Sequence, residues 1–415
     1  MRKRWVGLAA VLGCLVSVHA GPAWALSEET TMLLELLQAK GVITQKEAAE
    51  FSQTLENKLA VAAEDGHHHS VQSLTDRVER LEKKGGEGEG EPARRVKLSG
   101  LVEASLTAAR SEGASGARRN TSDLTLDTAL LNVDAAVNQY VNGHLALLYE
   151  EDPADPGTNN IGLDEAIIRV NGGVECPASA YGTFGRMYVP FGSFESHFVT
   201  DPLTLTLGET NDTAVVAGYM NETVDLSAGV FKGKVKEAGR GAHINAAVAS
   251  ATLSLPKGEG DLLAMNGGVS FLSNLATSDS LEAEVTSPEA AIADPVGGVS
   301  TFLSLAYDER FFLEAEYLGA VSDFADGDLN FVDPDNRRPR AWNLEAAARV
   351  LERLELALRY GGSAEAGTFL AEDEYGAALL YRLFDNTSLT IEYLFQEYLD
   401  RSDNSQATMQ LAVEL

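Results

Sequence analysis

Residues 190–212 form a polar connector that is unusually rich in aromatic rings and carboxylates. The side chains in it that could contact a solute are Phe191, Phe194, Glu195, His197, Asp201, Glu209 and Asp212. Connections of this length are uncommon and are often functional. Carboxylates attract cations, and aromatic rings pack a loop onto a wall or offer a ligand an apolar contact. The segment therefore predicts a substrate-binding loop or a pore constriction.

A second set of charged side chains alternates with apolar residues in the segments that flank this connector or follow it. We predict that these side chains line a lumen; they are Arg169, Arg186, Glu314, Glu316, Glu345, Arg349, Arg353, Glu355, Arg359 and Arg382. If the connector folds into that lumen, its acids and the arginines would create a transverse field that selects ions. The alternative is a connector that covers the lumen from outside, with the arginines paired locally with Glu165, Glu345 and Glu355.

Enzymatic chemistry finds little support in the same residues. No G-x-S-x-G motif occurs, and after residue 94 the histidines are His144, His197 and His243. Paired acids such as Glu314 and Glu316 suit acid–base work, but they are also expected in a water-filled pore. We predict no catalytic residues, no metal site and no cofactor. The run His67–His69 is interpreted as a solvated hinge, with weak metal binding as the alternative.

Strands with two different faces must position these side chains. In residues 353–360, RLELALRY, apolar and charged or small residues alternate, and residues 342–349 and 311–318 behave similarly. Alternation alone fits a soluble sandwich or a membrane barrel. The final strand keeps Met409, Leu411, Val413 and Leu415 on one face, as outer-membrane assembly signals do, although these usually end in Phe.

The spacing of the connections separates the two architectures. Residues 94–415 contain about sixteen candidate strands, at roughly 20 residues for a strand with its connection. Short connections alternate with long ones, and the long ones are Ser111–Thr121, Glu151–Asn160, Pro190–Asn211, Ala276–Pro295 and Val321–Arg338. Short turns on one side and long loops on the other are typical of an outer-membrane barrel. The expected fold is therefore all-β, a transmembrane antiparallel barrel of about 16 strands.

The residues before the barrel divide into three parts. Residues 1–25 have the charged start, apolar run and small-residue cleavage site of a secretory signal peptide. Residues 26–84 are predicted to be a periplasmic helical region, in which Val71, Leu74, Val78 and Leu81 keep the a/d spacing of a coiled coil. Residues 85–93 are a Gly/Glu linker. A homotrimer would supply the partner strands that so short a coil needs.

Overall charge restricts the partners. The formal net charge is −30, so a nucleic-acid partner bound through a basic surface is excluded. Arg337, Arg338 and Arg340 form a local basic cluster in one expected outer loop. Lipopolysaccharide phosphates would explain this cluster, and an anionic ligand is the alternative. Membrane lipid is the remaining expected partner of the barrel.

Residues 185–219, GRMYVPFGSFESHFVTDPLTLTLGETNDTAVVAGY, resemble the bacterial outer-membrane siderophore porins typified by the legiobactin receptor. The KGVITQKEAAE turn in the helical region is also similar to theirs. The resemblance implies a barrel with a periplasmic helical extension and a role in the uptake of iron-loaded siderophores. It is close over this one stretch and elsewhere concerns layout only.

The expected function is thus an outer-membrane porin for small hydrophilic solutes, plausibly including ferric siderophores. Two other classes stay open at this stage. One is a structural tether, whose helices grip the cell-wall layer while the barrel is plugged. The other, with less support, is an outer-membrane hydrolase.

Overall fold

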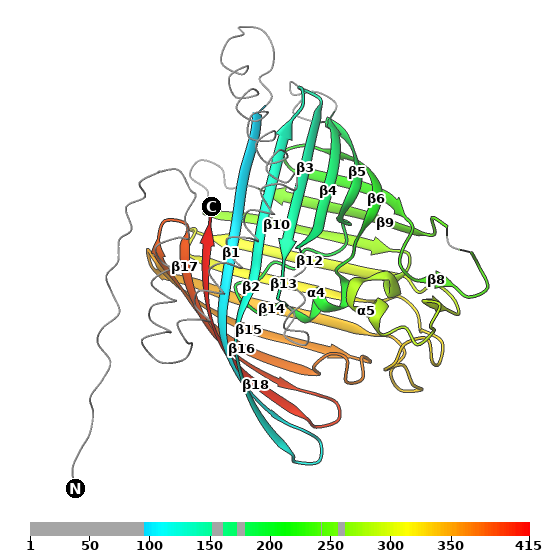
Figure 1. The fold of residues 1–415 in the computed structure, drawn as a ribbon, viewed down its shortest axis with the longest axis vertical. Coiled ribbons are helices and arrows are strands. Elements are labelled where there is room, and N and C mark those ends of the chain that lie inside the picture. The colour runs from blue at the N-terminus through cyan, green and yellow to red at the C-terminus, as the bar shows by residue number, and fades with distance from the viewer. Residues whose placement is uncertain (1–94, 152–160, 172–178, 242, 256–261) are drawn as a thin grey trace, which may run out of the picture. The chain divides into compact units, whose positions relative to one another are not determined.

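The computed structural model describes residues 95–151, 161–171, 179–241, 243–255 and 262–415. Within them, antiparallel strands close a barrel of sixteen, in the order β1-β18-β17-β16-β15-β14-β13-β12-β10-β9-β7-β6-β5-β4-β3-β2 (Figure 1). The predicted closed barrel of about sixteen strands is confirmed. The signal peptide, the helical region, the Gly/Glu linker and His67–His69 lie outside the described residues. Among those described, no helix is long and apolar enough to span a membrane.

The barrel strands follow one another as sequence neighbours, except where short elements intervene. The first eight are β1 Arg95–Glu112, β2 Arg118–Ala136, β3 Val141–Tyr149, β4 Ile161–Asn171, β5 Ser179–Tyr188, β6 Asn211–Met220, β7 Val224–Phe231 and β9 Ala246–Leu255. The other eight are β10 Leu263–Leu272, β12 Gly298–Tyr307, β13 Phe311–Ala320, β14 Arg340–Leu351, β15 Leu354–Ala364, β16 Asp373–Phe384, β17 Thr387–Glu397 and β18 Asp403–Glu414. The first and last strands pair with each other, for example Val102 with Val413.

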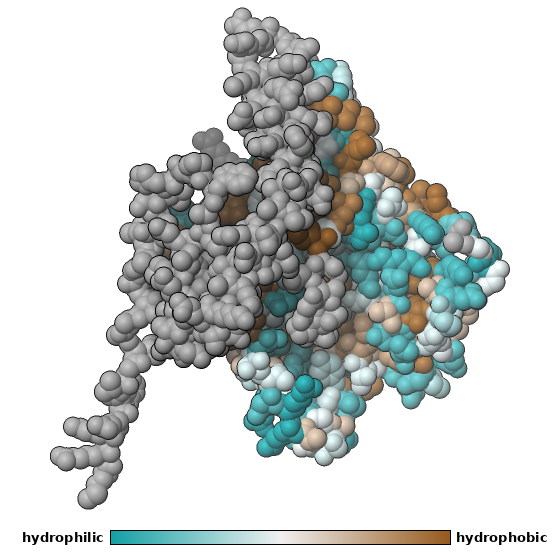
Figure 2. Space-filling model, viewed as in Figure 1, coloured by the Kyte–Doolittle hydropathy of each residue, from teal (hydrophilic) through white to brown (hydrophobic). Residues whose placement is uncertain are grey.

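Alternation along each strand gives the wall two chemically different faces. On β15, Leu356 and Leu358 are exposed, while Ala357 and Arg359 are buried. An exposed apolar face on every second residue is what lipid contact requires of a barrel. Figure 2 shows apolar surface over strands and more hydrophilic surface over the loops. The polar face of the wall therefore points into the lumen.

Long connections gather and pack together at one end of the barrel. They contain the helices α4 Leu203–Gly208 and α5 Asp279–Ala283, the single turn η1 Leu275–Thr277, and the parallel pair β8 Lys236–Glu237 with β11 Ala291–Ile292. Leu207, Leu275, Leu281 and Phe324 have at most 1% exposure and belong to one apolar cluster. α4 contacts α5 and also β13, β14 and β15 (Figure 1). This core fixes the loops against one side of the wall.

Short turns join the strands at the opposite end, which we call the short-turn end. Examples are the turns at Asn221, at Asp308–Glu309 and at Asp385–Asn386. Asp308, Glu309 and Asn386 have φ between 53° and 58°, the left-handed region that tight hairpin turns use. The end that carries the long connections is called the long-loop end. The predicted long connections at residues 190–211, 276–295 and 321–338 are present, but the one predicted at Ser111–Thr121 is wrong: β1 and β2 continue as paired strands through Glu112 and Arg118, and only residues 113–117 connect them.

Candidate functional site

The connector between β5 and β6, residues 189–210, crosses the lumen to the opposite wall. Its first attachment is Glu316 of β13, a carboxylate with 8% exposure. The backbone N–H groups of Ser193 and Phe194 donate to it at 2.9 and 3.1 Å, and Thr204 Oγ1 donates at 2.9 Å. Ser300 of β12 donates the fourth bond at 3.0 Å. Both ends of the segment 194–203 are therefore held by the same carboxylate, and the residues between them extend away from it.

Two further wall carboxylates hold the middle of this excursion. Glu345 of β14 accepts the His197 N–H at 2.7 Å and the Ser196 hydroxyl at 3.0 Å. Glu392 of β17 accepts the N–H groups of Val199 and Thr200 at 2.8 and 3.1 Å, and also the Thr200 hydroxyl. Hydrogen bonds to a charged acceptor are about twice as strong as neutral ones. The loop is thus fixed at three places by carboxyl side chains of the wall.

Arg359 of β15 is the counter-ion beneath the loop. It has no exposed side-chain surface, and it lies between Glu345 at 2.9 Å and Glu374 of β16 at 3.3 Å. Its Nη2 donates to Ser196 Oγ at 2.6 Å, and its guanidinium covers the Phe198 ring at 4.3 Å. Because burial of unpaired carboxylates is very costly, this arginine is required for Glu345 to act as a loop anchor.

Two glycines allow the backbones and rings around the loop to come close. At Gly376 of β16, a Cβ atom would lie 2.5 Å from the Phe198 ring. At Gly185 of β5, where φ is 141°, a Cβ atom would lie 1.9 Å from the Ala166 carbonyl oxygen. At Gly185 only glycine fits without backbone movement, whereas at Gly376 a larger residue would displace the Phe198 ring. The loop and the strand that leads into it therefore depend on these two residues.

His197 forms the last loop-to-wall contact. Its Nδ1 lies 2.8 Å from Glu355 of β15, and its ring is 5.5 Å from Phe312 of β13. Burial opposes the charged imidazole, but the bond to Glu355 and the nearby Glu345 charge outweigh it and raise the pKa of His197. The imidazole therefore stays charged to higher pH than usual, and its attachment to Glu355 weakens as the pH rises through that pKa.

On its other side the loop presents acids. Burial raises the pKa of Asp201, Glu392 adds to the shift, and the Arg359 charge opposes it. Burial, followed by repulsion from Asp201, Asp279, Asp164 and Glu150, raises the pKa of Glu209 to about 7.

The opposite wall, β1 to β4, is also acidic. Glu103 of β1 is close enough to Asp201 for the two charges to interact. Burial, with repulsion from Asp164 and Asp201, raises the pKa of Glu150, which directly follows β3. Acids of the loop and acids of this wall are therefore close enough for their charges to interact.

The other predicted loop residues take different positions. Phe191 is 2% exposed in the apolar core, and Phe194 packs against that core. Glu195 is exposed. Asp212 is the second residue of β6 and lines a separate cavity of about 410 Å³ with Lys232 and other residues of the long-loop end. The structure thus brings Glu195, His197, Asp201 and Glu209 together on the inserted segment and leaves Asp212 apart from them.

One predicted pore-lining residue lies on the wrong face. Arg186 pairs with Thr213, and both are exposed on the same side of the sheet as Phe184. The neighbouring Met187 is 5% exposed and belongs to the core inside the barrel. Arg186 therefore points outward, where its Nε donates to the Asp164 carbonyl oxygen at 3.2 Å. The prediction that Arg186 lines the lumen is wrong.

The remaining wall arginines make local contacts instead of facing the loop acids. Arg169 of β4 lies 4.1 Å from the Tyr181 ring centroid and lines a cavity of about 540 Å³ with Lys97 and His144. Arg349 lies 3.7 Å from Glu355. Arg349 is thus paired locally with Glu355, as the alternative interpretation expected.

The basic cluster of the β13–β14 connection is also internally bonded. Arg337 pairs with Asp326, Arg338 Nε donates to the Ala320 carbonyl oxygen at 2.9 Å, and Arg340 lies 2.9 Å from Glu365. Each guanidinium thus has a partner within the protein, while all three side chains keep exposed surface.

Sequence reasoning missed Glu392, Glu374 and Glu103 as members of this site. Glu392 alternates with the exposed Ile391 and Tyr393, so the period-2 pattern did carry the signal. A period of two residues predicts which face of the wall a side chain occupies. It does not predict which N–H group of the loop will lie opposite that side chain. Glu314 lines a small pocket with Ser193, Phe194 and Glu195 and so remains beside the loop.

Comparisons with known proteins agree with this barrel. Two solved structures show the likeness. The outer membrane channel DcaP of Acinetobacter baumannii aligns with a TM-score of 0.54 at 16% identity, over 80% of this chain and 99% of that chain. The anion-selective porin from Comamonas acidovorans aligns with a TM-score of 0.51 at 12% identity, over 78% and 100%. The fold is that of the outer-membrane porins.

The relatives found by sequence are distant, and their names state no function. No family model matches the chain. It is 26% identical over 72% of its length to a UPF0422 protein of Coxiella burnetii, of which the match covers 63%. It is 28% identical over 54% of its length to a UPF0422 protein of Legionella pneumophila, of which it covers 44%. The chain therefore spans less than two thirds of these relatives, and the resemblance to siderophore porins is not confirmed by them.

Proposed function

We propose that the chain is an outer-membrane porin that passes small hydrophilic solutes and prefers cations. One observation carries this proposal: Glu316, Glu345 and Glu392 hold the inserted loop across the lumen, and its acids face an acidic wall. A water-filled passage lined by one sign of charge raises the local concentration of the opposite ion. The same geometry supports a porin over an enzyme, since the buried acids act as hydrogen-bond acceptors for the loop.

Location and assembly are part of the same proposal. The apolar outer face of the barrel fits an outer-membrane lipid environment, with the short-turn end and the residues before β1 in the periplasm. The heptads at residues 71–81 fit a homotrimer. Chemical cross-linking in intact outer membranes checks this assembly, and only monomers would count against it.

Uptake of ferric siderophores is the finer proposal for the solute. Its support is the resemblance of residues 185–219, which include the inserted loop, to siderophore porins. The acidic passage adds a physical criterion, because it repels anionic complexes and admits neutral or cationic ones. Growth of a deletion strain on ferric siderophores of different net charge tests this proposal. Equal growth of strains with and without the protein would contradict a role in siderophore uptake.

Single-channel recording in planar bilayers tests the porin itself. The purified full chain should produce open steps in dilute salt, with a reversal potential that shows cations crossing more easily than anions. The preference should weaken as salt rises, because the Debye length shrinks from about 30 Å at 0.01 M to about 3 Å at 1 M. A silent membrane would support the tether, and anion preference would contradict the acidic passage.

Cation preference should also depend on pH. Because the pKa of Glu209 is raised to about 7, its carboxylate is mostly neutral at pH 6 and mostly charged at pH 8. Raising the pH over this range adds negative charge to the passage and should increase the cation-to-anion permeability ratio. Glu209→Gln should remove most of this increase, and the exposed Glu195→Gln is the matched control. An unchanged pH profile in Glu209→Gln would show that Glu209 does not face the permeating ions.

A further inference from the structure

The short-turn end of β14 to β18 encloses a cavity whose charge is unlike that of the loop region. Its volume is about 690 Å³. The polar residues that line it are Glu352, Arg353, Glu355, Arg382, Asp385, Asn386, Thr387, Ser388 and Glu414. Ser388 stands on the lumen face of β17, four residues from the loop anchor Glu392, which is about 13 Å along a strand. The cavity therefore lies towards the short-turn end from the loop anchors and borders the inserted loop at Glu355, the carboxylate that contacts His197.

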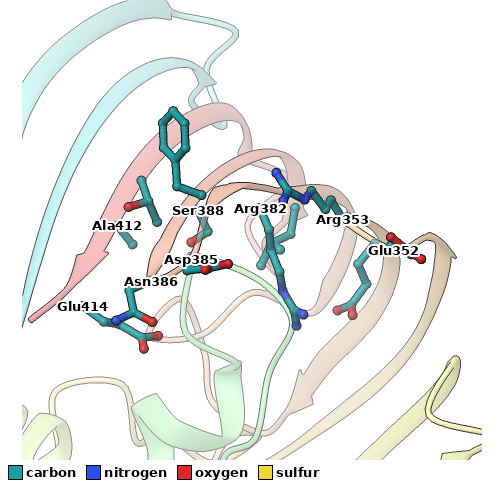
Figure 3. Close-up of a pocket in the computed structure, with 12 residues that line it drawn as sticks. Glu352, Arg353, Arg382, Asp385, Asn386, Ser388, Ala412 and Glu414 are labelled. Atoms are coloured by element: carbon teal, nitrogen blue, oxygen red, sulfur yellow. The ribbon is translucent and has the colours of Figure 1, made fainter.

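Two arginines on neighbouring strands form the basic part of the cavity. The backbone N–H of Arg382 donates to the Arg353 carbonyl oxygen at 2.9 Å, which places the two residues side by side. Figure 3 shows Arg353 and Arg382 between Glu352 on one side and Asp385, Asn386 and Glu414 on the other, with the two arginine side chains extending in different directions. Basic and acidic groups thus meet within the dimensions of a small solute.

The Arg382 guanidinium is uncommitted. Within the described part of the chain it makes no hydrogen bond or ion pair, and its electrostatic partner is Glu355. Arg353 Nη1 donates a hydrogen bond to the Leu383 carbonyl oxygen at 3.3 Å. By contrast, Arg349 and Arg359 are each bound to wall acids. A guanidinium presents its donors in a planar fork that matches a carboxylate.

We propose that this cavity binds small zwitterionic solutes of the amino-acid type. Arg382 and Arg353 hold the carboxylate, with the Thr387 and Ser388 hydroxyl groups beside it. Glu352, Asp385 and Glu414 accept the ammonium group at the rim. A solute with positive charge also suits the acidic passage, so the two sites favour the same class. The inference rests on the proposed function, since the solute reaches the cavity through the barrel.

L-lysine and L-lysinamide are matched probes, because only the first carries a carboxylate. L-lysine added on either side of a bilayer should reduce the open-channel current at lower concentration than L-lysinamide does. Arg382→Gln should raise the half-blocking concentration of L-lysine by about tenfold or more, as for the loss of one charged hydrogen-bonded partner. It should leave L-lysinamide unaffected. Arg119→Gln, at an exposed position of β2, is the control and should change neither value.

Failure of the pore and failure of the cavity have different signatures. A conducting channel that L-lysine and L-lysinamide block equally, or whose L-lysine block survives Arg382→Gln, overturns the cavity and leaves the porin intact. A silent channel overturns the porin. In that case, calorimetric titration of L-lysine into the detergent-solubilised full chain tests the cavity separately. Binding that Arg382→Gln abolishes would support the proposed site. Absence of binding in the unaltered chain would contradict it.

Discussion

Replacing Arg359 by methionine should destabilise the barrel more than any other single charge removal at the loop. The substitution leaves Glu345 and Glu374 without a counter-ion at positions with no exposed surface. Removing one partner of a buried ion pair typically costs about 3–5 kcal/mol. Methionine fills similar volume, so the loss would reflect charge and not a cavity. The temperature at which the folded, fast-migrating form disappears from unboiled gels should fall accordingly.

A triple variant that removes all three charges distinguishes an electrostatic cause from a packing defect. Arg359→Met combined with Glu345→Gln and Glu374→Gln removes all three charges and should recover part of the lost stability, because no ion then remains unpaired. Arg110→Met, at an exposed pair 3.8 Å from Glu112, should leave the stability of the unaltered chain almost unchanged. No recovery in the triple variant would show that Arg359 acts through packing against Phe198.

The barrel could be predicted because its signals are local. Alternation along residues 353–360 survives in β15 residue by residue, and the hairpin turns carry their own chemistry, as at Asn386. The counts of strands and short turns follow from such features without any tertiary information. The alternation is weak in β9, AAVASATLSL, because its residues are mostly small and its two faces differ little in polarity.

The site could be predicted only in part. Residues 190–210 were recognisable by composition, but Phe191 serves the core and Asp212 lines another cavity. Arg186 shows the main error: alternation already grouped it with Phe184 and Tyr188, and its charge was given more weight than its face. Which carboxylates meet the loop depends on its path across the lumen. Glu316 and Glu392 are separated by 76 residues of sequence, and no local pattern connects them.

Shortening the inserted loop should have the largest effect on conduction. Ser193 and Thr204 bind the same Glu316 carboxylate, so the ends of the excursion are close together. Replacing Glu195–Asp201 by two glycines therefore removes the part that crosses the lumen and keeps Phe191 and α4 in the core. Single-channel conductance should rise by roughly twofold or more as the open cross-section grows. Cation preference should fall at the same time, because Asp201 is lost.

A variant that keeps the full loop but loosens one anchor tests whether position or mere presence matters. Glu392→Gln keeps the side chain's shape and removes the charge that holds Val199 and Thr200. Charged hydrogen bonds contribute about 1.5–3 kcal/mol, so the loop should leave its seat more often. Current noise should increase, with brief excursions towards the conductance of the variant with the shortened loop.

Equal conductance in the unaltered chain and the shortened variant would place the rate-limiting constriction elsewhere in the barrel. Quiet, unchanged currents in Glu392→Gln would show that Glu316 and Glu345 alone hold the loop.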